Sequence, residues 1–304
     1  MRKMVIVCGL AGVAAFGGGC ASPAGRNADI SQALVKEARP DLDVVAAAAA
    51  RFREGDFSDA ALKTHSDGEL DQLYEALYRV NFYYPGRKNS IVLQRGVLEE
   101  RLRRKRQTNE DGERMHKVYI GARMFKDAAA IGKLFPGAEF PAVPELIVSG
   151  GGGENKWRVY DISDGGKRAE LRSLPLAAGR RIIMEIFTGC PTAEKALGDI
   201  LADPALSDAF RKYGLLVTDR FDAVGVLLWR EHFKFPEVYI AHRRDEFPGV
   251  NFRTSPNFYF LDAGEIKHSF FGWADKSRPD SGAANLLKGL RAISVPVEEA
   301  GHGG

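Results

Sequence analysis

Cysteine is scarce in this sequence: its 304 residues include three, Cys8, Cys20 and Cys190. Neither sign of charge dominates, because 43 basic and 40 acidic residues leave a net charge of +3, which gives no electrostatic reason to expect a nucleic-acid partner. Phosphate-binding loops, Gly-x-Ser-x-Gly segments and metal-ligand spacings are also missing, so we expect no metal, nucleotide or other cofactor. The chain is long enough for two domains of about 150 residues each, and its hydrophobic content of 45% is sufficient for real cores.

The first twenty residues differ from the rest of the chain. A basic start precedes an apolar run over residues 4–16, which is too short to span a bilayer and is typical of a secretory signal peptide. The small residues Gly18 and Gly19 before Cys20 resemble the end of a bacterial lipoprotein signal, although Gly17 stands where that pattern usually has a leucine or similar residue. Ordinary cleavage at an Ala-x-Ala-like site, without a lipid, is the alternative.

The lipoprotein resemblance implies that residues 1–19 are removed and that Cys20 carries a diacylglycerol anchor in the membrane. Residues 20–40 are polar and are predicted to form an irregular tether. Ala21 after the lipidated cysteine implies sorting to the outer membrane, with the protein on the periplasmic face of the bacterial envelope. Cys8 would leave with the signal and Cys20 would be a thioether, so Cys190 would be the single free thiol and could form no internal disulfide.

Residues 41–149 show a helical pattern and are predicted to form an all-α domain of helical hairpins. Apolar spacing predicts helices over 44–52, 91–106 and 115–134, and Ser66 and Glu69 have the spacing of a capping box before a further helix. The pairs weakly resemble tetratricopeptide hairpins, without a fixed repeat period. The arginine-rich run at 101–106 would either bind an acidic surface or form a solvated helix face, and we favour the second.

A loop or linker is predicted over 141–153, and a different pattern begins at Trp157. Short apolar or alternating runs predict strands at 157–161, 167–171, 181–187 and 215–218, and a hairpin at 257–271. Helical spacing appears at 192–201, at 207–213 and in a last helix ending near Ile293. Strands alternating with helices in this way predict an α/β domain over residues 155–304.

Three segments of this domain together resemble the thioredoxin superfamily. The first is an apolar strand that runs into Cys190 at the start of a helix, and the second is the Asp203-Pro204 segment, with a short helix and a strand after it. The third is Ser255-Pro256 ahead of the hairpin, where the family has a cis-proline, closed by a Phe-Gly-Trp segment at 271–273. The leading strands at 157–171 resemble those of membrane-anchored redoxin-type thiol reductases. The resemblance implies a thioredoxin-like fold for the C-terminal domain.

This sequence departs from that family where the chemistry lies. The Cys-x-x-Cys motif is replaced by Cys190-Pro191-Thr192-Ala193, so that Ala193 stands at the position of the resolving cysteine. Gly189 replaces the tryptophan that usually precedes the first cysteine. A mixed disulfide on Cys190 could not be released from within the chain, which excludes ordinary two-cysteine exchange.

Cys190 is the predicted catalytic residue. A thiolate is favoured at a helix N-terminus, and Pro191 suits the first helical position. A cis Pro256 would place the backbone of Ser255 beside the thiol, so Ser255, Pro256 and Pro191 are the predicted substrate contacts. The predicted chemistry is monothiol redox or mixed-disulfide formation with an envelope protein or a glutathione-like thiol. Peroxidase activity is less favoured, since the threonine-containing segment expected upstream is missing.

Two other hypotheses for this domain stay open. Cys190 could instead be a buried, inert thiol in a degenerate domain used for binding, because free cysteine is often buried. The domain could also be an assembly factor that pairs with an extended segment at the Ser255 edge. Among other residues, Glu185 is either a proton acceptor near the thiol or, as we favour, a residue on a solvated edge. His232, His242 and His268 are scattered, without the spacing of a metal site.

Overall fold

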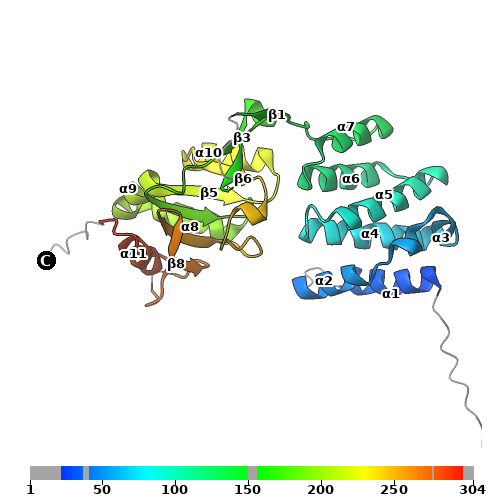
Figure 1. Cartoon of the computed structure of the whole chain (residues 1–304), viewed down its shortest axis with the longest axis horizontal. Helices are drawn as coiled ribbons and strands as arrows, with labels where there is room; N and C mark the ends of the chain where they lie inside the picture. Colours follow the sequence, from blue (N-terminus) through cyan, green and yellow to red (C-terminus); the bar gives the residue numbers. More distant parts are fainter. Residues whose placement is uncertain (1–21, 37–40, 150–155, 276, 297–304) are drawn as a thin grey trace, which may run out of the picture. The chain divides into compact units, whose positions relative to one another are not determined.

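The computed structural model of the protein describes residues 22–36, 41–149, 156–275 and 277–296 (Figure 1). The chain divides into two compact units, the first ending at Gln107 and the second beginning at Thr108. Residues 1–21 lie outside the described residues, so the signal peptide and the lipid on Cys20 stay predictions. None of the helices in the described ranges is both long and apolar enough to cross a membrane.

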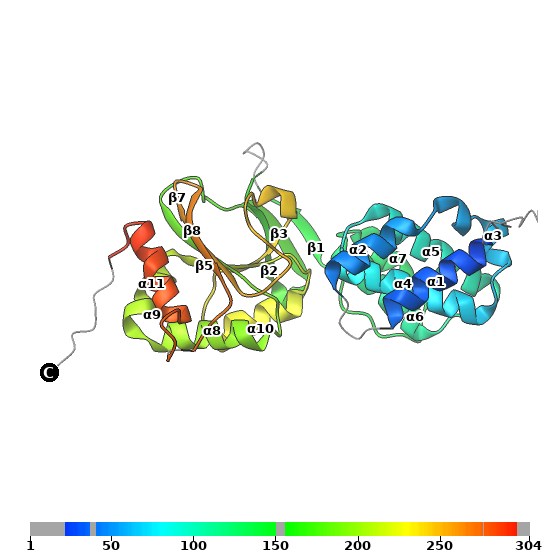
Figure 2. The same ribbon diagram turned by 90° about the horizontal axis from the view of Figure 1, so that it is seen from below.

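Helices make up the first unit (Figures 1 and 2). They are α1 (Pro23–Val35), α2 (Leu42–Arg51), the short 3-10 helix η1 (Glu54–Phe57), α3 (Asp59–Lys63), α4 (Asp67–Tyr83) and α5 (Lys88–Arg103). The predicted capping box is confirmed at the start of α4, where Ser66 and Glu69 bond each other's backbone N–H groups. Helix α4 packs against α1, α2 and α5, and the apolar core between α1, α2 and α4 includes Ile30, Val45 and Val80.

Helix α1 corrects the prediction of an irregular tether over residues 20–40. Ser22 caps the helix by accepting a hydrogen bond of 3.1 Å from the backbone N–H of Gly25. Ile30 and Leu34, four residues apart, are 2% and 0% exposed, and they join the core of the unit. The segment is polar on average, but two apolar residues at helical spacing are enough to bury one face.

The arginine-rich end of α5 is solvated in part, as we favoured: Arg103 and Arg106 are exposed, whereas Arg101 and Arg104 are not. Arg101 is buried and pairs with Asp71. Arg104 donates to a carboxylate oxygen of Glu100 at 2.6 Å and to the carbonyl of Leu62 at 3.1 Å. Arg101 and Arg104 are therefore bound by carboxylates and carbonyls of the same unit.

The second unit begins with two helices, α6 (Asn109–Gly121) and α7 (Phe125–Leu134), where a single helix was predicted. The chain turns between them at Arg123, whose φ of 61° is left-handed. The Arg123 guanidinium donates to the carbonyls of Asp219 (2.5 Å) and Ala241 (3.1 Å), at the ends of two strands. Because these helices group with the sheet, the first compact unit ends at Gln107, before the predicted boundary at 149, although helices continue to Leu134.

The rest of this unit is mixed α/β and contains an eight-stranded sheet in the order β1-β3-β2-β6-β5-β4-β7-β8. The strands are β1 (Glu145–Val148), β2 (Arg158–Ser163), β3 (Arg168–Ser173), β4 (Arg180–Glu185), β5 (Gly214–Thr218), β6 (Val238–Ala241), β7 (Asn257–Asp262) and β8 (Glu265–Phe271). Strands β4, β5 and β6 are parallel, whereas β7 runs antiparallel to β4. The predicted strands and hairpin are confirmed, while β1 lies in the predicted linker and β6 was not predicted.

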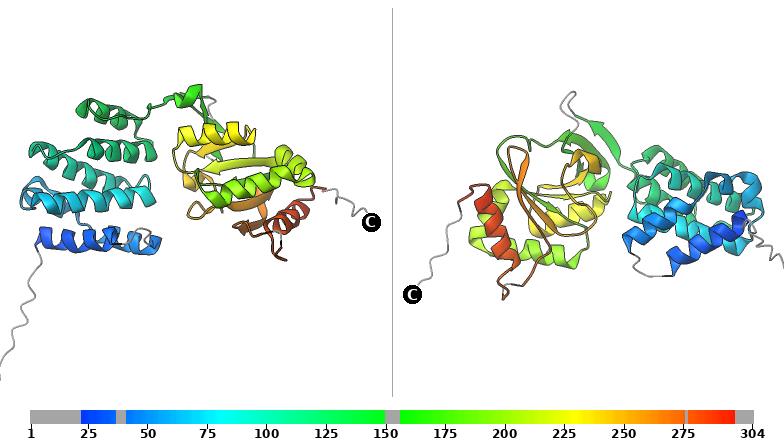
Figure 3. Two further views of the ribbon diagram at one scale, coloured as in Figure 1. Left: turned by 180° about the vertical axis from the view of Figure 1, so that it is seen from behind. Right: turned by 60° about the horizontal axis from the view of Figure 1, so that its bottom comes forward.

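Four helices pack on one face of this sheet: α8 (Pro191–Ala202), α9 (Pro204–Tyr213), α10 (Ala223–Phe233) and α11 (Gly282–Ala292) (Figures 2 and 3). Strands β5 and β6 follow β4 in one direction across the sheet, and because parallel crossovers are right-handed as a rule, α8 and α10 lie on the same side. Met184 and Leu216 point into the core beneath the helices. Alternate residues such as Ile183 point to the other face, where the described core residues include Phe247, at the end of the short 3-10 helix η3 (Arg244–Glu246), and Phe252, but none from an α-helix.

Candidate functional site at the carboxyl end of strand β4

Cys190 lies five residues after the end of β4 and is the N-cap residue of α8. Its backbone N–H donates to the carbonyl of Phe187 at 3.0 Å, and its own carbonyl accepts the first helical hydrogen bond, from Glu194, at 3.0 Å. Pro191 occupies the first turn of the helix, as predicted. The side chain of Cys190 is half-buried and makes no disulfide.

Gly189 explains one departure from the thioredoxin pattern in physical terms. Its φ is 78°, in the left-handed region that favours glycine. A tryptophan at this position would be strained, because its side chain disfavours the left-handed backbone conformation that the loop adopts here.

Ser255 and Pro256 approach the thiol as predicted, and the peptide bond between them is cis. The Sγ atom of Cys190 lies 3.8 Å from the carbonyl oxygen of Ser255, the distance of a weak S–H···O hydrogen bond. The hydroxyl of Ser255 accepts a hydrogen bond of 2.8 Å from the backbone N–H of Phe187. Two contacts thus join the loop after β4 to the residue before Pro256.

The position of the missing resolving cysteine lies in the core. Ala193 is 0% exposed and packs with the apolar residues beneath α8. Cys190 is the free thiol in the described part of the chain, so disulfide chemistry there would take its second sulfur from another molecule.

Glu185, the last residue of β4, is 0% exposed, so the prediction of a solvated edge was wrong. Burial, with a smaller contribution from Asp219, raises the pKa of its carboxyl to about 9, although a hydrogen bond from Asn257 acts in the opposite direction. Its Oε2 atom lies 3.2 Å from the Asn257 amide nitrogen, while its Oε1 atom is buried without a hydrogen-bond partner. Glu185 is therefore a neutral acid at neutral pH.

Asn257 links this buried acid to the loop that presents Ser255. Its side-chain amide donates to the carbonyl of Asn251 at 3.1 Å and lies 3.2 Å from the hydroxyl of Thr254. Sequence reasoning placed Asn257 at the start of the hairpin but gave it no role, because only the strand register sets it opposite Glu185.

Two further side chains come from the segment after β5. The hydroxyl of Thr188 donates to a carboxylate oxygen of Asp222 at 2.6 Å. The guanidinium of Arg220 lies 4.2 Å from the centre of the Phe187 ring, a cation–π contact that brings positive charge to the loop before the thiol. Both contacts join segments more than thirty residues apart, and no local pattern in the sequence signals them.

The three histidines singled out in the sequence, His232, His242 and His268, do not gather. His242 contacts Glu246 at 2.8 Å, His232 packs against the Phe233 ring, and His268 has a buried Nε2 atom without a partner. Within the described ranges, no group of three or more histidine, cysteine, aspartate or glutamate side chains could hold a metal ion.

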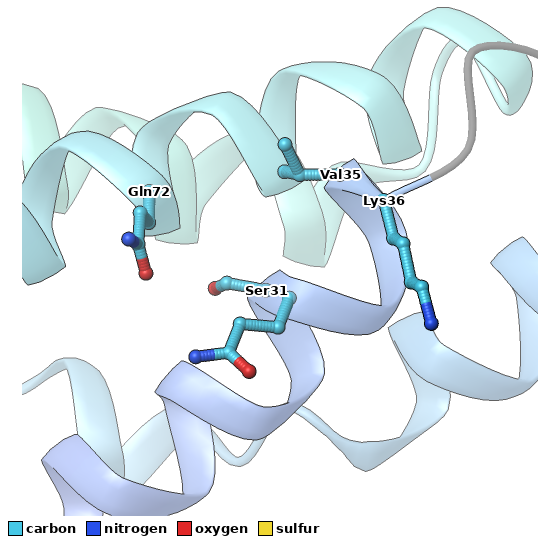
Figure 4. A pocket seen from close by; sticks show the side chains of 5 residues that line it. Ser31, Val35, Lys36 and Gln72 are labelled. Carbon is cyan, nitrogen blue, oxygen red and sulfur yellow. The ribbon is translucent and has the colours of Figure 1, made fainter.

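Two surface pockets occur in the first unit, and neither is lined by a residue of the thiol site. One, of about 320 Å³, lies at the end of α1, where Ser31 and Gln72 face the same space (Figure 4). The other, of about 500 Å³, is lined by residues of α5 such as Val92 and Arg95. Neither adds a reactive group to the site at Cys190.

Comparison with known proteins does not identify the chain. No protein-family model matches it, and no curated protein matches it significantly. Among solved structures it is similar to an uncharacterized conserved protein from Geobacillus kaustophilus, with 16% identity, coverage of 47% of this chain and 84% of that chain, and a TM-score of 0.30. At that TM-score the similarity carries no argument about fold or function.

Proposed function

We propose that the second unit contains a thioredoxin-like domain that performs single-thiol chemistry at Cys190. The order of elements supports this proposal: β4, α8, β5, α10 and β6 form parallel crossovers, and the β7–β8 hairpin and α11 follow. The cysteine at the start of the first of these helices, and the cis-proline before β7, stand where the family places them.

The observation that carries the proposal is the contact of 3.8 Å between Sγ of Cys190 and the carbonyl of Ser255. It sets a half-buried thiol at a helix N-terminus beside a backbone carbonyl. In the proposed reaction the Cys190 thiolate attacks a disulfide, one sulfur of which joins Cys190 while the other leaves as a thiolate that takes up a proton. An external thiol, as its thiolate, then attacks the substrate sulfur of this mixed disulfide, forms a new disulfide with it and releases Cys190 as a thiolate, so that no second cysteine of the chain is needed.

The proposed partners are an envelope protein with a disulfide, and a glutathione-like thiol that regenerates Cys190. We place the protein on the periplasmic face of the outer membrane, held by a lipid on Cys20. A Cys20→Ser variant expressed in bacteria should lose incorporation of labelled fatty acid while the wild-type chain retains it. Equal labelling of the two chains, or none of either, would contradict the lipid anchor.

Alkylation of the folded protein tests the chemistry. The chain with Cys8 and Cys20 replaced by serine keeps Cys190 as its thiol, and the additional Cys190→Ser variant is the control. We expect rapid labelling by iodoacetamide in native buffer, and a mixed disulfide with oxidised glutathione that reduced glutathione reverses. A thiol that reacts only after unfolding in guanidinium would refute the proposal and leave a binding module.

A further inference from the structure

Asp222 connects two segments through the two oxygens of one carboxylate. Its Oδ1 atom accepts a hydrogen bond of 2.9 Å from the backbone N–H of Gly225, which caps the N-terminus of α10. Its Oδ2 atom accepts the hydrogen bond of 2.6 Å from the hydroxyl of Thr188, two residues before Cys190. The helix therefore holds the carboxylate in place, and the carboxylate holds the loop that leads to the thiol.

Gly225 makes this arrangement possible. A Cβ atom at this position would lie 2.0 Å from the Asp222 Oδ2 atom and 2.9 Å from the Thr188 Cβ atom, closer than side chains tolerate. Any other residue would push the first turn of α10 away from the carboxylate and from Thr188. Thr188, Asp222 and Gly225, from two segments of the chain, thus pack together closely.

The loop before Cys190 needs such a support. Gly189, between Thr188 and Cys190, has a left-handed φ of 78° and the backbone freedom of a glycine. On the β7 side, the loop is fixed by the hydrogen bond from the Phe187 N–H to Ser255. On the α10 side, Asp222 fixes it through Thr188. With both supports, Sγ of Cys190 stays at the helix N-terminus and near the Ser255 carbonyl.

We propose that Asp222, acting through Thr188, is a positioning residue for the Cys190 thiol, an inference that rests on the proposed single-thiol function. The hydrogen bond from a hydroxyl to an ionised carboxylate is of the stronger kind, so its loss should release the loop. Asp222 does not touch the reacting sulfur. Its effect is on where the sulfur lies and not on the bond that forms.

The test compares Thr188→Val, which removes the hydroxyl, with Thr188→Ser, which keeps it. Both are made in the chain whose single thiol is Cys190, and iodoacetamide labelling is followed across pH together with thermal unfolding. We expect Thr188→Val to lower the labelling rate at pH 7 by about threefold to tenfold, the size expected for one lost hydrogen bond, and to change the pH–rate profile. The labelling rate of Thr188→Ser should stay within about twofold of the rate of the parent chain, because serine keeps the hydroxyl that donates to Asp222.

Asp222→Ser is the second variant, for the case in which Thr188→Val does not fold. Serine is a good N-cap residue but is too short to serve both partners, so α10 stays capped while the contact with Thr188 is lost. Slower labelling of this variant with an altered pH profile supports the inference. Unchanged or faster labelling, or an equal loss in Thr188→Val and Thr188→Ser, overturns it while the proposed function stands. A parent thiol that reacts only after unfolding overturns both.

Discussion

The carboxyl of Glu185 lies 3.2 Å from the side-chain amide of Asn257, its register partner on the neighbouring strand. This pair lies at the carboxyl end of β4, and Asn257 directly follows Pro256 of the thiol site. The acid is buried, and the pKa of its carboxyl is raised to about 9. The proton on Glu185 is thus part of the folded structure at neutral pH, which has a direct consequence for stability.

We expect the free energy of unfolding to fall as pH rises from about 4.5 to about 9 because of this group. A raised pKa in the folded state means that the unfolded chain loses the proton first, so the stabilising contribution is complete below 4.5 and is lost through 9. Glu185→Gln should remove this dependence and be more stable than the wild type at pH 8 by ~1 kcal/mol or more. Urea denaturation at pH 6 and pH 8 measures both effects.

The control is Glu265→Gln, because the Glu265 side chain is 74% exposed. This variant should keep the pH dependence of the wild type. If the stability of the wild type falls no more from pH 6 to pH 8 than that of Glu185→Gln, the carboxyl of Glu185 does not hold its proton in the folded protein and the argument fails.

Replacement of Ala193 by cysteine should convert the single thiol into a pair. Residues 190 and 193 are three apart at the start of α8, a spacing that places their side chains on one face of a helix. Cysteine behaves as a small hydrophobic residue, so the buried position should accept it. After treatment with oxidised glutathione, mass spectrometry should show an internal disulfide in Ala193→Cys and a persistent glutathione adduct in the wild type.

Ala196→Cys is the matched control, since residue 196 is also buried but lies six positions from Cys190. It should keep the glutathione adduct. An adduct that persists equally in Ala193→Cys would show that the second sulfur cannot reach the first, contrary to the expected geometry.

The features that sequence reasoning recovered are those with local signals. The capping box needs only Ser66 and Glu69, and the β7–β8 hairpin needs only the turn at Ala263 and Gly264, both with left-handed φ angles. Cys190 was found because an apolar strand, a cysteine and a proline follow one another. Signals of this kind lie within a few residues of the element they specify.

The missed features depend on contacts between distant segments. The burial of Glu185 depends on the place of β4 inside the sheet, between β5 and β7, which alternation along the sequence does not reveal. Asp222 and Thr188 are 34 positions apart, and their hydrogen bond exists only once α10 packs on the sheet. Strand β6 has four residues, too few for a periodic pattern to stand out.

Arg220 should favour negatively charged reagents at the thiol. Its guanidinium lies over the ring of Phe187, whose carbonyl accepts the N–H of Cys190. Arg220→Ala should therefore lower the rate of labelling by iodoacetate, an anion, more than the rate with neutral iodoacetamide, by about twofold or more at low salt, where surface charges are least screened. The ratio of the two rates is the measurement, and Arg211→Ala, on α9, is the control. An unchanged ratio would mean that the charge of Arg220 does not act at the sulfur.

Arg104 should be a main contributor to the stability of the first unit. Its guanidinium binds the carbonyls of Leu62 and His65, at 3.1 and 2.9 Å, and the carboxylates of Glu100 and Asp67, at 2.6 and 3.0 Å. These groups lie on α4, on α5 and at the end of α3, so one side chain joins three helices. Arg104→Ala removes all four contacts, although Leu62, Glu100 and Asp67 each keep another partner, and it should cost on the order of 2 kcal/mol, as for other hydrogen bonds to charged groups.

Arg95→Ala on the same helix is the comparison for Arg104→Ala. Arg95 pairs with Glu99 at 2.8 Å, and both side chains are more than half exposed, so its loss should cost under about 1 kcal/mol. Thermal unfolding of both variants, followed by the helical circular-dichroism signal in the far ultraviolet, should show a clearly lower midpoint for Arg104→Ala alone. Equal midpoints would mean that solvent replaces the contacts of Arg104 without loss, and that the charges at the end of α5 act as independent surface pairs.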